Sequence, residues 1–129
     1  LLLDTHAFIC YVEDSPLLPQ STKLEIQKPQ NDILLSIVSL WEIGIKLSLG
    51  KLTLSISITE IFDLVIENGF GILPIQPEHI IKNTMLDFHH RDPIDRLIIA
   101  QSLTERIKIV SKDNQFDNYR VDRIWAIDN

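Results

Sequence analysis

The sequence predicts an α/β domain with a mostly parallel central sheet. Short apolar runs of strand length alternate along the chain with longer stretches whose apolar residues recur at helical spacing. Proline and glycine stand between these stretches, where they end one element and start the next. The chain carries no internal repeat, no low-complexity segment and no linker, so we expect a single domain over residues 1–129.

The expected strands and helices follow one another in a regular order. Strand-like apolar runs lie at 1–3, 33–36, 70–75, 107–111 and 123–127. Helical spacing is found at 5–13, 21–28, 39–49, 59–68, 77–86 and 92–106, and a turn or short helix is expected at 114–118. Pro16 and Pro19 break the first helix and Pro29 stops the second. Gly50 and Gly69 close the third and fourth helices.

The helix expected at 92–106 has the best-defined start. Asp92 is the expected N-cap, and Pro93 follows as the first helical residue, where its missing N–H costs nothing. Asp95 then falls in the first turn, near the positive end of the helix. Because the remaining pattern anchors the helix in a core, its acidic start can face a cleft. The anchoring positions are Ile94, Leu97, Ile98 and Gln101.

Composition and charge exclude several classes of protein. Of 129 residues, 45% are apolar and 23% charged, and no transmembrane run or signal peptide is visible. Cys10 is the only cysteine, so we expect no internal disulfide and a reducing, cytoplasmic location. The net charge of −6 argues against a generic basic nucleic-acid binder, but permits an enzyme that gathers acids around a metal. Because the chain starts at Leu1 rather than Met, we expect a few residues to be missing before it.

Four acids are candidates for one site. Asp4 directly follows the first strand, Glu42 is expected in the first turn of the helix after the second strand, and Asp113 follows the fourth strand. The carboxyl ends of parallel strands meet at one edge of the sheet, which is where ligands bind in such folds. Asp95 opens a helix that could reach the same edge, although no strand immediately precedes it.

Each acid also has a purely structural interpretation. Asp4 could be an N-cap, Glu42 could pair with Ser39 in a capping box, Asp113 could be a turn residue, and Asp95 could complement the helix dipole. For Glu42 we favour function, because it is the only acid of a long apolar stretch and a lone buried carboxylate is costly. Several carboxylates in one site need a counter-charge, and oxygen ligands select Mg²⁺ or Mn²⁺ over zinc.

Further segments carry a family pattern in their order and spacing. They are LLDTHA at 2–7, SLWEIGIK at 39–46, GKL at 50–52, HHRDPIDRLIIAQ at 89–101 and SKD at 111–113. Together these segments resemble the PIN domain, in particular the VapC-like branch of toxin–antitoxin nucleases. The resemblance covers essentially the whole chain. The family often has threonine where this chain has Ser111, which keeps the hydroxyl.

The resemblance implies a fold, an activity and partners. It implies a three-layer α/β/α sandwich, Mg²⁺- or Mn²⁺-dependent endoribonuclease cleavage of RNA, a VapB-like antitoxin that blocks the site, and homodimers. It assigns the metal to the motif-matched acids Asp4, Glu42, Asp95 and Asp113. Our leading hypothesis is therefore an endoribonuclease toxin in which metal-activated water attacks an RNA phosphodiester.

Secondary candidates surround these acids. Thr5 and Ser111 could orient ligands or water, or could act only as caps. Arg96 could hold a substrate phosphate, or could be a solvated helix charge. Basic residues near the expected edge are few, which suits a folded or limited RNA target. They are Lys46, Arg91, Arg96 and Lys112.

The histidines and several apolar residues are interpreted as structural or as parts of a protein surface. For His6, His89 and His90 we favour a structural or surface role, because two adjacent histidines point differently and make a poor metal pair. Trp41 is expected to pack in the core. The apolar residues of the first two helices exceed what one short helix face needs, and are candidates for an antitoxin or dimer surface. These residues include Phe8, Tyr11, Val12 and Leu18.

Two other functions stay open at this point. A receiver-type phosphoacceptor domain also has an acid pocket at a parallel sheet edge, but it needs an acidic pair near the first strand and a lysine after the last. Asp4 has no acidic neighbour, and no such lysine is evident. A catalytically silent binding module would keep the fold only for partner contact. The presence of all four acids argues against a silent module.

Overall fold

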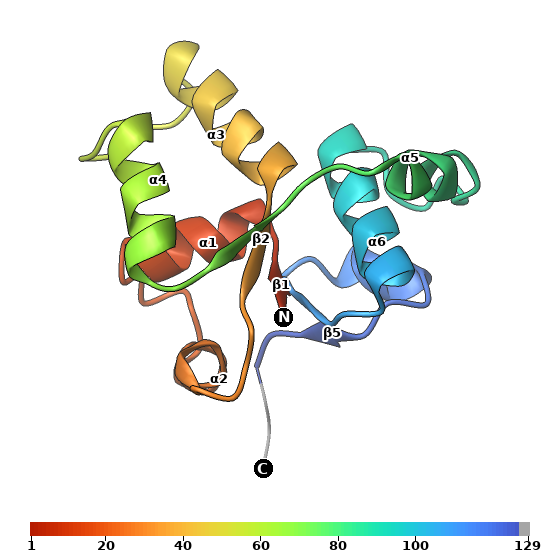
Figure 1. The fold of residues 1–129 in the computed structure, drawn as a ribbon, viewed down its shortest axis with the longest axis horizontal. Coiled ribbons are helices and arrows are strands. Elements are labelled where there is room, and N and C mark those ends of the chain that lie inside the picture. Colours follow the sequence, from red (N-terminus) through yellow and green to blue (C-terminus); the bar gives the residue numbers. More distant parts are fainter. Residues whose placement is uncertain (127–129) are drawn as a thin grey trace.

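A five-stranded, all-parallel sheet forms the centre of the molecule (Figure 1). The computed structural model describes residues 1–126. The strands are β1 (Leu2–Leu3), β2 (Leu34–Ser36), β3 (Gly71–Leu73), β4 (Ile109–Val110) and β5 (Arg123–Ile124). Their order in the sheet is β3-β2-β1-β4-β5. The last strand was expected to reach Ile127, which lies outside the described residues.

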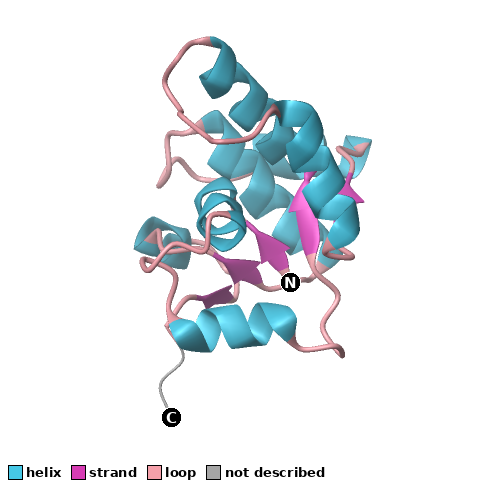
Figure 2. Ribbon diagram, turned by 90° about the vertical axis from the view of Figure 1, so that its left-hand side faces the viewer, coloured by secondary structure: helices cyan, strands magenta, loops and turns pink. Residues whose placement is uncertain are grey.

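Helices cover both faces of this sheet, so the predicted three-layer α/β/α arrangement is confirmed (Figure 2). The α-helices are α1 (Thr5–Val12), α2 (Gln20–Gln27), α3 (Ile37–Ser48), α4 (Ile58–Glu67), α5 (Pro77–Thr84) and α6 (Pro93–Glu105), and a 3₁₀ helix, η1, spans Asn114–Asn118. One core lies under α1, α2 and α4, and a second lies under α6 and η1. Within residues 1–126, no helix is long and apolar enough to cross a membrane.

Successive side chains of the short strands point to opposite faces of the sheet and so pack into both cores. Leu2 of β1 and its partner Ile109 of β4 face the core under α6. The next residues, Leu3 and Val110, point to the opposite face and join the core under α1. Successive side chains of a strand point to opposite faces, so two apolar residues in a row serve both layers. This is why strands buried on both faces are apolar at every position.

The strand order also fixes where a ligand can bind. From β1 the chain proceeds outward through β2 to β3, and then returns to add β4 and β5 on the other side of β1. The direction of winding therefore reverses between β1 and β4. In open parallel sheets, the crevice outside the carboxyl ends of the strands at such a switch point is the binding site.

The start of α3 differs from the prediction. The helix begins at Ile37, with Ser36 as N-cap accepting a hydrogen bond from the Val38 N–H at 3.2 Å. Ser39 therefore lies inside the helix, and Glu42 lies in its second turn rather than its first. A capping box between Ser39 and Glu42 is wrong, because Ser39 is not the residue at which the backbone turns helical.

The start of α4 differs by one residue. The helix begins at Ile58 rather than Thr59, and Ser57 is its N-cap. Ser57 and Glu60 form a capping box: the Glu60 N–H donates to Ser57 Oγ at 3.2 Å, and the Ser57 N–H donates to Glu60 Oε1 at 3.3 Å. The helix therefore starts directly after Ser57, because a serine three residues before a glutamate forms a capping box at a helix start.

Two predictions about apolar residues are wrong. Trp41 was expected in the core, but it is 64% exposed on the outer side of α3. Phe8 and Leu18 were expected on a partner surface, but they are buried in the core under α1. Tyr11 and Val12 are partly buried and pack against that same core. These four residues therefore contribute to the core, whereas Leu24 of α2 is 53% exposed.

Truncation of Phe8 should test this core. Phe8 is fully buried, so Phe8→Ala removes a large apolar group and leaves a cavity. We expect the free energy of unfolding to fall by about 3–5 kcal/mol, measured by urea denaturation. The matched control is Leu17→Ala, since Leu17 is 62% exposed. Equal effects of the two variants would contradict the placement of Phe8.

Candidate metal centre

The four predicted acids line a single cavity at the carboxyl edge of the sheet. The cavity has a volume of about 750 Å³. It lies beyond β1 and β4, at the switch point described above. The predicted acids Asp4, Glu42, Asp95 and Asp113 line it together with Asp92, the N-cap of the helix that carries Asp95. The structure therefore brings together residues from four separate parts of the chain, as the order of the strands predicted.

Asp4 and Asp113 each follow a strand and cap the helix that comes next. Asp4 Oδ1 accepts a hydrogen bond from the Ala7 N–H at 2.7 Å, at the start of α1. Asp113 Oδ1 accepts one from the Gln115 N–H at 2.9 Å, at the start of η1. The structural interpretation of Asp4 as a cap is therefore correct, Asp113 caps η1 instead of only forming a turn, and both acids line the cavity. The N–H groups at each helix start hold the carboxylate in one orientation.

Asp95 reaches the cavity from the start of α6, where the predicted N-terminal signals are confirmed. Pro93 is the first helical residue, and Asp92 Oδ1 accepts hydrogen bonds from the N–H groups of Ile94 at 2.9 Å and Asp95 at 3.1 Å. Asp92 thus serves as the cap, which leaves the Asp95 carboxylate free to point into the cavity. The Asp95 side chain is 25% exposed.

Glu42 projects from the second turn of α3. Its side chain is only 12% exposed, and Oε2 lies 3.0 Å from Lys46 Nζ, one turn further along the helix. An acid and a lysine four residues apart lie on the same face of a helix. Lys46, which also lines the cavity, therefore gives the Glu42 carboxylate a partner of opposite charge.

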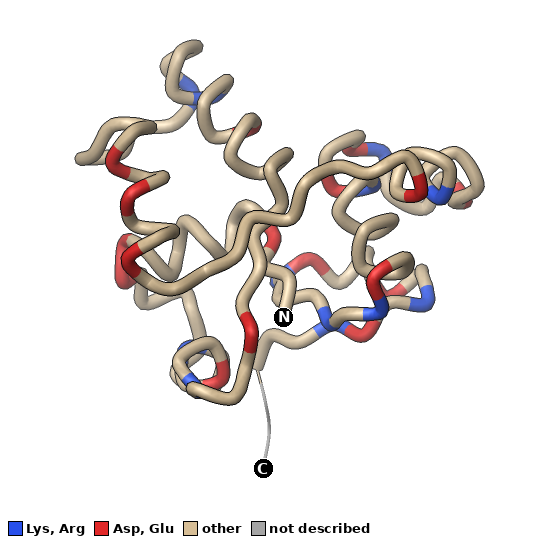
Figure 3. The backbone as a smooth tube through the Cα atoms, in the orientation of Figure 1, with Lys and Arg blue, Asp and Glu red and all other residues tan. Residues whose placement is uncertain are grey.

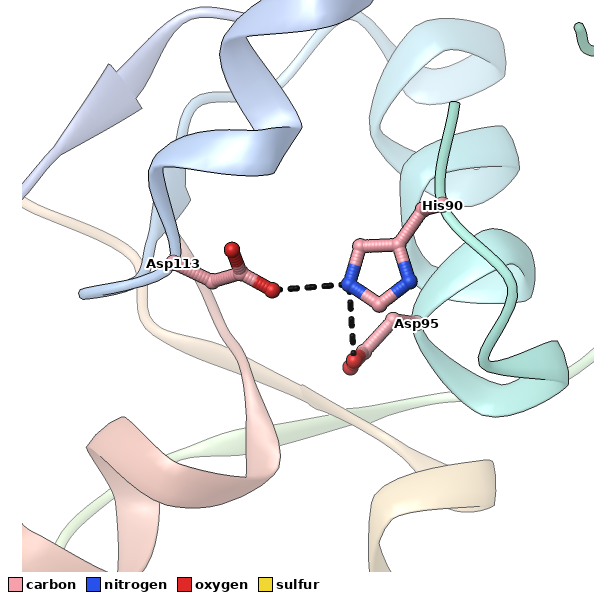
Figure 4. Close-up of side chains that lie close together, drawn as sticks. All are labelled: His90, Asp95 and Asp113. Carbon is pink, nitrogen blue, oxygen red and sulfur yellow. Dashed lines mark hydrogen bonds and ion pairs between the residues drawn. The ribbon is translucent and has the colours of Figure 1, made fainter. Parts of the chain in front are cut away.

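His90 joins two of the acids, and the sequence interpretation missed it (Figure 4). Its Nε2 lies 2.7 Å from Asp113 Oδ2 and 3.3 Å from Asp95 Oδ2. One ligand atom from each of these three residues lies within 4.8 Å of the others, which makes them a candidate metal-binding group. Its position in the sequence could have indicated this contact. His90 lies two residues before Asp92, the N-cap of α6, so its ring can fold back over the first turn of that helix.

Burial and neighbouring charges change the acidity of two carboxyls. Burial raises the pKa of Asp95 to about 7, and the carboxylates of Asp92, Asp4 and Glu42 add to the rise while His90 opposes it. Burial also raises the pKa of Asp4, against the hydrogen bonds from Ser111 and the Ala7 N–H. Both shifts express the cost of placing like charges together away from water.

Thr5 and Ser111 support the site from behind. Thr5 Oγ1 donates to Ser39 Oγ at 3.0 Å, a buried contact that links α1 to α3. Ser111 Oγ accepts from the Asp113 N–H at 3.0 Å and its side chain also bonds to Asp4. Ser111 is fully buried directly after β4. Its hydroxyl therefore connects the two strand-end acids.

Arg96 has a role that neither sequence interpretation gave it. It is 6% exposed, so it is not a solvated helix charge, and it does not line the cavity. Its guanidinium donates to backbone carbonyls of residues 83–90 and packs 4.0 Å from the centre of the Phe88 ring. The carbonyl partners are Asn83, Leu86, Asp87 and His90. With these contacts made, it holds the loop before α6 rather than a substrate phosphate.

The donor set fits a hard divalent cation. Carboxylate oxygens from four residues line one cavity, and such oxygens are the ligands that Mg²⁺ and Mn²⁺ take in proteins. Burial is the largest cause of the raised pKa of Asp95, repulsion from neighbouring carboxylates adds to it, and a cation among these oxygens would offset both. Lys46, Lys51 and Lys112 lie on the rim of the same cavity. Elsewhere, basic and acidic residues are interspersed along the chain (Figure 3).

The raised pKa of Asp95 predicts how stability depends on pH in EDTA. The folded protein keeps a proton on Asp95 up to about pH 7, whereas the unfolded chain releases it near 3.8. Stability from this group is therefore complete at low pH and is lost as the pH rises toward 7. We expect the free energy of unfolding of the wild type to fall relative to that of Asp95→Asn between about pH 4 and about pH 7.

Urea denaturation of both proteins across this range makes the measurement. Asp95→Asn cannot ionise at this position, so the difference between the two curves isolates the carboxyl. Parallel curves for the two proteins would contradict the raised pKa.

The fold is similar to that of solved toxin–antitoxin structures. One is VapBC2 from Rickettsia felis bound to a DNA fragment from its promoter, with a TM-score of 0.74 and 16% identity over 97% of this chain and 98% of that chain. FitAcB from Neisseria gonorrhoeae has a TM-score of 0.64 and 19% identity, over 95% of this chain and 94% of that chain. A toxin–antitoxin complex from Klebsiella pneumoniae has a TM-score of 0.66 and 12% identity, over 95% and 94%.

Sequence comparison identifies the family. No match is found among curated protein sequences. A model of the PIN domain, however, matches residues 1–122, which is nearly the whole chain and includes all four acids. The chain therefore belongs to the PIN domain family.

Proposed function

We propose that this protein is a metal-dependent endoribonuclease of the VapC type, acting as one domain. The observation that carries the proposal is the cavity of about 750 Å³ into which Asp4, Glu42, Asp95 and Asp113 converge. Ionised groups of one sign are costly to gather in a partly buried cavity. A fold that keeps four of them at its ligand-binding edge is well suited to hold a divalent cation and a phosphodiester.

These residues have distinct tasks in the proposed reaction. Asp4, Glu42, Asp95 and Asp113 would hold Mg²⁺ or Mn²⁺, which supplies Lewis-acid activation of the phosphodiester and of the attacking water. The N–H groups at the starts of α1 and η1 orient the carboxylates of Asp4 and Asp113. The Ser111 hydroxyl bonds to Asp4 and to the Asp113 N–H, and so fixes the position of one acid relative to the other. One of the four carboxylates accepts the proton of the attacking water.

The cavity rim supplies the contacts with the nucleic acid. Lys51 and Lys112 are exposed on this rim, and they come from the loop after α3 and the loop after β4. In a chain with a net charge of −6, this local positive charge favours limited phosphate contact over tight non-specific binding.

RNA as the substrate, a VapB-like antitoxin as inhibitor and a homodimer are further parts of the proposal. RNA rests on the resemblance to the VapC-like branch. The antitoxin is supported by the fold neighbours, which are described as toxin–antitoxin complexes. Several large apolar side chains are exposed and suit contact with protein partners. Among them are Trp41, Ile81, Met85 and Phe88. The cytoplasm remains our prediction for its location.

The activity can be tested with purified protein and a mixed RNA pool, with Mg²⁺, with Mn²⁺ and with EDTA. We expect discrete fragments only with a metal. Asp4→Asn and Asp95→Asn should each lower the cleavage rate by more than a hundredfold, because partners that only support a ligand already cost about 10–100-fold. Both variants should remain folded by circular dichroism.

The control for these variants is Asp63→Asn, which removes an exposed acid of α4 that does not line the cavity. It should cleave like the wild type. Wild-type cleavage by Asp95→Asn would exclude the assignment of the acids. No Mn²⁺ binding by the wild type in calorimetry would instead favour the silent binding module.

The rim lysines should contribute to RNA binding rather than to chemistry. In an Asp95→Asn background that cannot cleave, Lys51→Gln and Lys112→Gln should weaken binding of a single-stranded RNA in fluorescence anisotropy. Each should also reduce the slope of log affinity against log salt concentration by about 0.7, the share of one phosphate contact on a single strand. Lys108→Gln, at the opposite edge of the sheet, is the control. A slope unchanged by both rim variants would exclude them as phosphate contacts.

A further inference from the structure

We infer that His90 is a positioning residue for Asp113 and Asp95, and that it is not itself a metal ligand. This inference rests on the proposed metal-dependent function and deepens it, because it gives a task to a residue outside the four acids. The three residues form a candidate metal-binding group by distance alone. The hydrogen bonds of the His90 ring decide between the two roles.

The ring has its proton on Nε2. Its other nitrogen, Nδ1, accepts a hydrogen bond from the Asp92 N–H at 3.2 Å. A proton on Nδ1 would face that N–H, so Nδ1 must present its lone pair. In this tautomer Nε2 carries the hydrogen and donates it to Asp113 Oδ2 at 2.7 Å, with Asp95 Oδ2 at 3.3 Å. Neither nitrogen then has a lone pair left for a cation.

The surroundings hold the ring in this orientation. The His90 N–H donates to Tyr119 Oη at 2.9 Å, and its carbonyl accepts from Arg96 Nη1 at 3.3 Å. Tyr119 Oη in turn donates to the Asp87 carbonyl at 2.6 Å. His90 is 7% exposed, and its ring lies 5.5 Å from that of Phe116. Backbone and ring are therefore both fixed, and turning Nε2 away from the acids would break several contacts.

This arrangement fixes the orientation of the Asp113 carboxylate. Asp113 uses Oδ1 for the cap of η1 and Oδ2 for His90, so its orientation is completely specified. Carboxylates oriented by N–H donors bind metals more tightly than free ones, because the donors reduce the cost of ordering them. An all-oxygen site also disfavours zinc, which binds imidazole nitrogen well. His90 thereby contributes to selection of Mg²⁺ or Mn²⁺.

Two substitutions separate the roles by Mn²⁺ calorimetry on the full chain. His90→Leu removes the donor and should raise the Kd for Mn²⁺ by about 10–100-fold, the usual effect of losing such a partner. His90→Gln places an amide N–H near the position of Nε2 and should restore binding to within about tenfold of the wild type, below that range. His89→Leu is the matched control, because the neighbouring His89 is exposed, and it should bind Mn²⁺ like the wild type.

A spectroscopic measurement on the wild type decides the matter without relying on variants. Electron spin echo modulation of bound Mn²⁺ reports a directly coordinated imidazole nitrogen. We expect no such coupling from His90. Strong nitrogen coupling that disappears in His90→Gln would overturn the inference, as would equal loss of affinity in the Gln and Leu variants with both folded. Absence of any Mn²⁺ binding by the wild type would overturn the proposed function together with it.

Discussion

Repulsion among carboxylates at one edge of the sheet is the constraint on which the rest of the structure depends. Asp4, Glu42, Asp95 and Asp113 share one cavity, and burial with mutual repulsion raises the pKa of Asp95 to about 7. Such a group is unstable unless other parts of the chain offset its charge. The offset comes from helix starts, from Lys46 beside Glu42, and from the His90 ring between two of the acids.

The helix starts serve both fold and site. A residue at the end of a parallel strand is also the residue at which the following helix begins, because the chain turns there. Asp4 and Asp113 occupy this place after β1 and β4, cap α1 and η1 with one oxygen, and face the cavity. A cap and a cation ligand both need a carboxylate held in one orientation. The cap role of these acids is therefore compatible with the proposed ligand role.

Predictions failed where a side chain's role depends on distant partners. Trp41 is a large apolar residue of the kind usually found in a core. However, α3 buries its neighbours Leu40 and Ile43, and Trp41 lies on the opposite, exposed side of the helix. Arg96 has the charge of a phosphate contact, but its hydrogen bonds go to carbonyls of residues 83–90, which no local pattern announces. Phe8 was assigned to a surface because one short helix seemed to need fewer apolar residues, whereas the core also contains residues of α2 and α4.

The sequence by itself determined the parallel α/β order and the N-cap of α6, because both depend on neighbours along the chain. It also determined the convergence of Asp4 and Asp113, because parallel strands end at one edge of the sheet. It also predicted Glu42 and Asp95 for the same site, although the start of α3 was misplaced by two residues. Only the tertiary structure decided the role of His90. Its partner Asp113 lies 23 residues away, and the hydrogen bond to the Asp92 N–H that fixes its tautomer exists only when the loop folds over the start of α6. A hydrogen bond between residues far apart in the sequence depends on the packing of the whole domain, so no local or periodic sequence pattern predicts it.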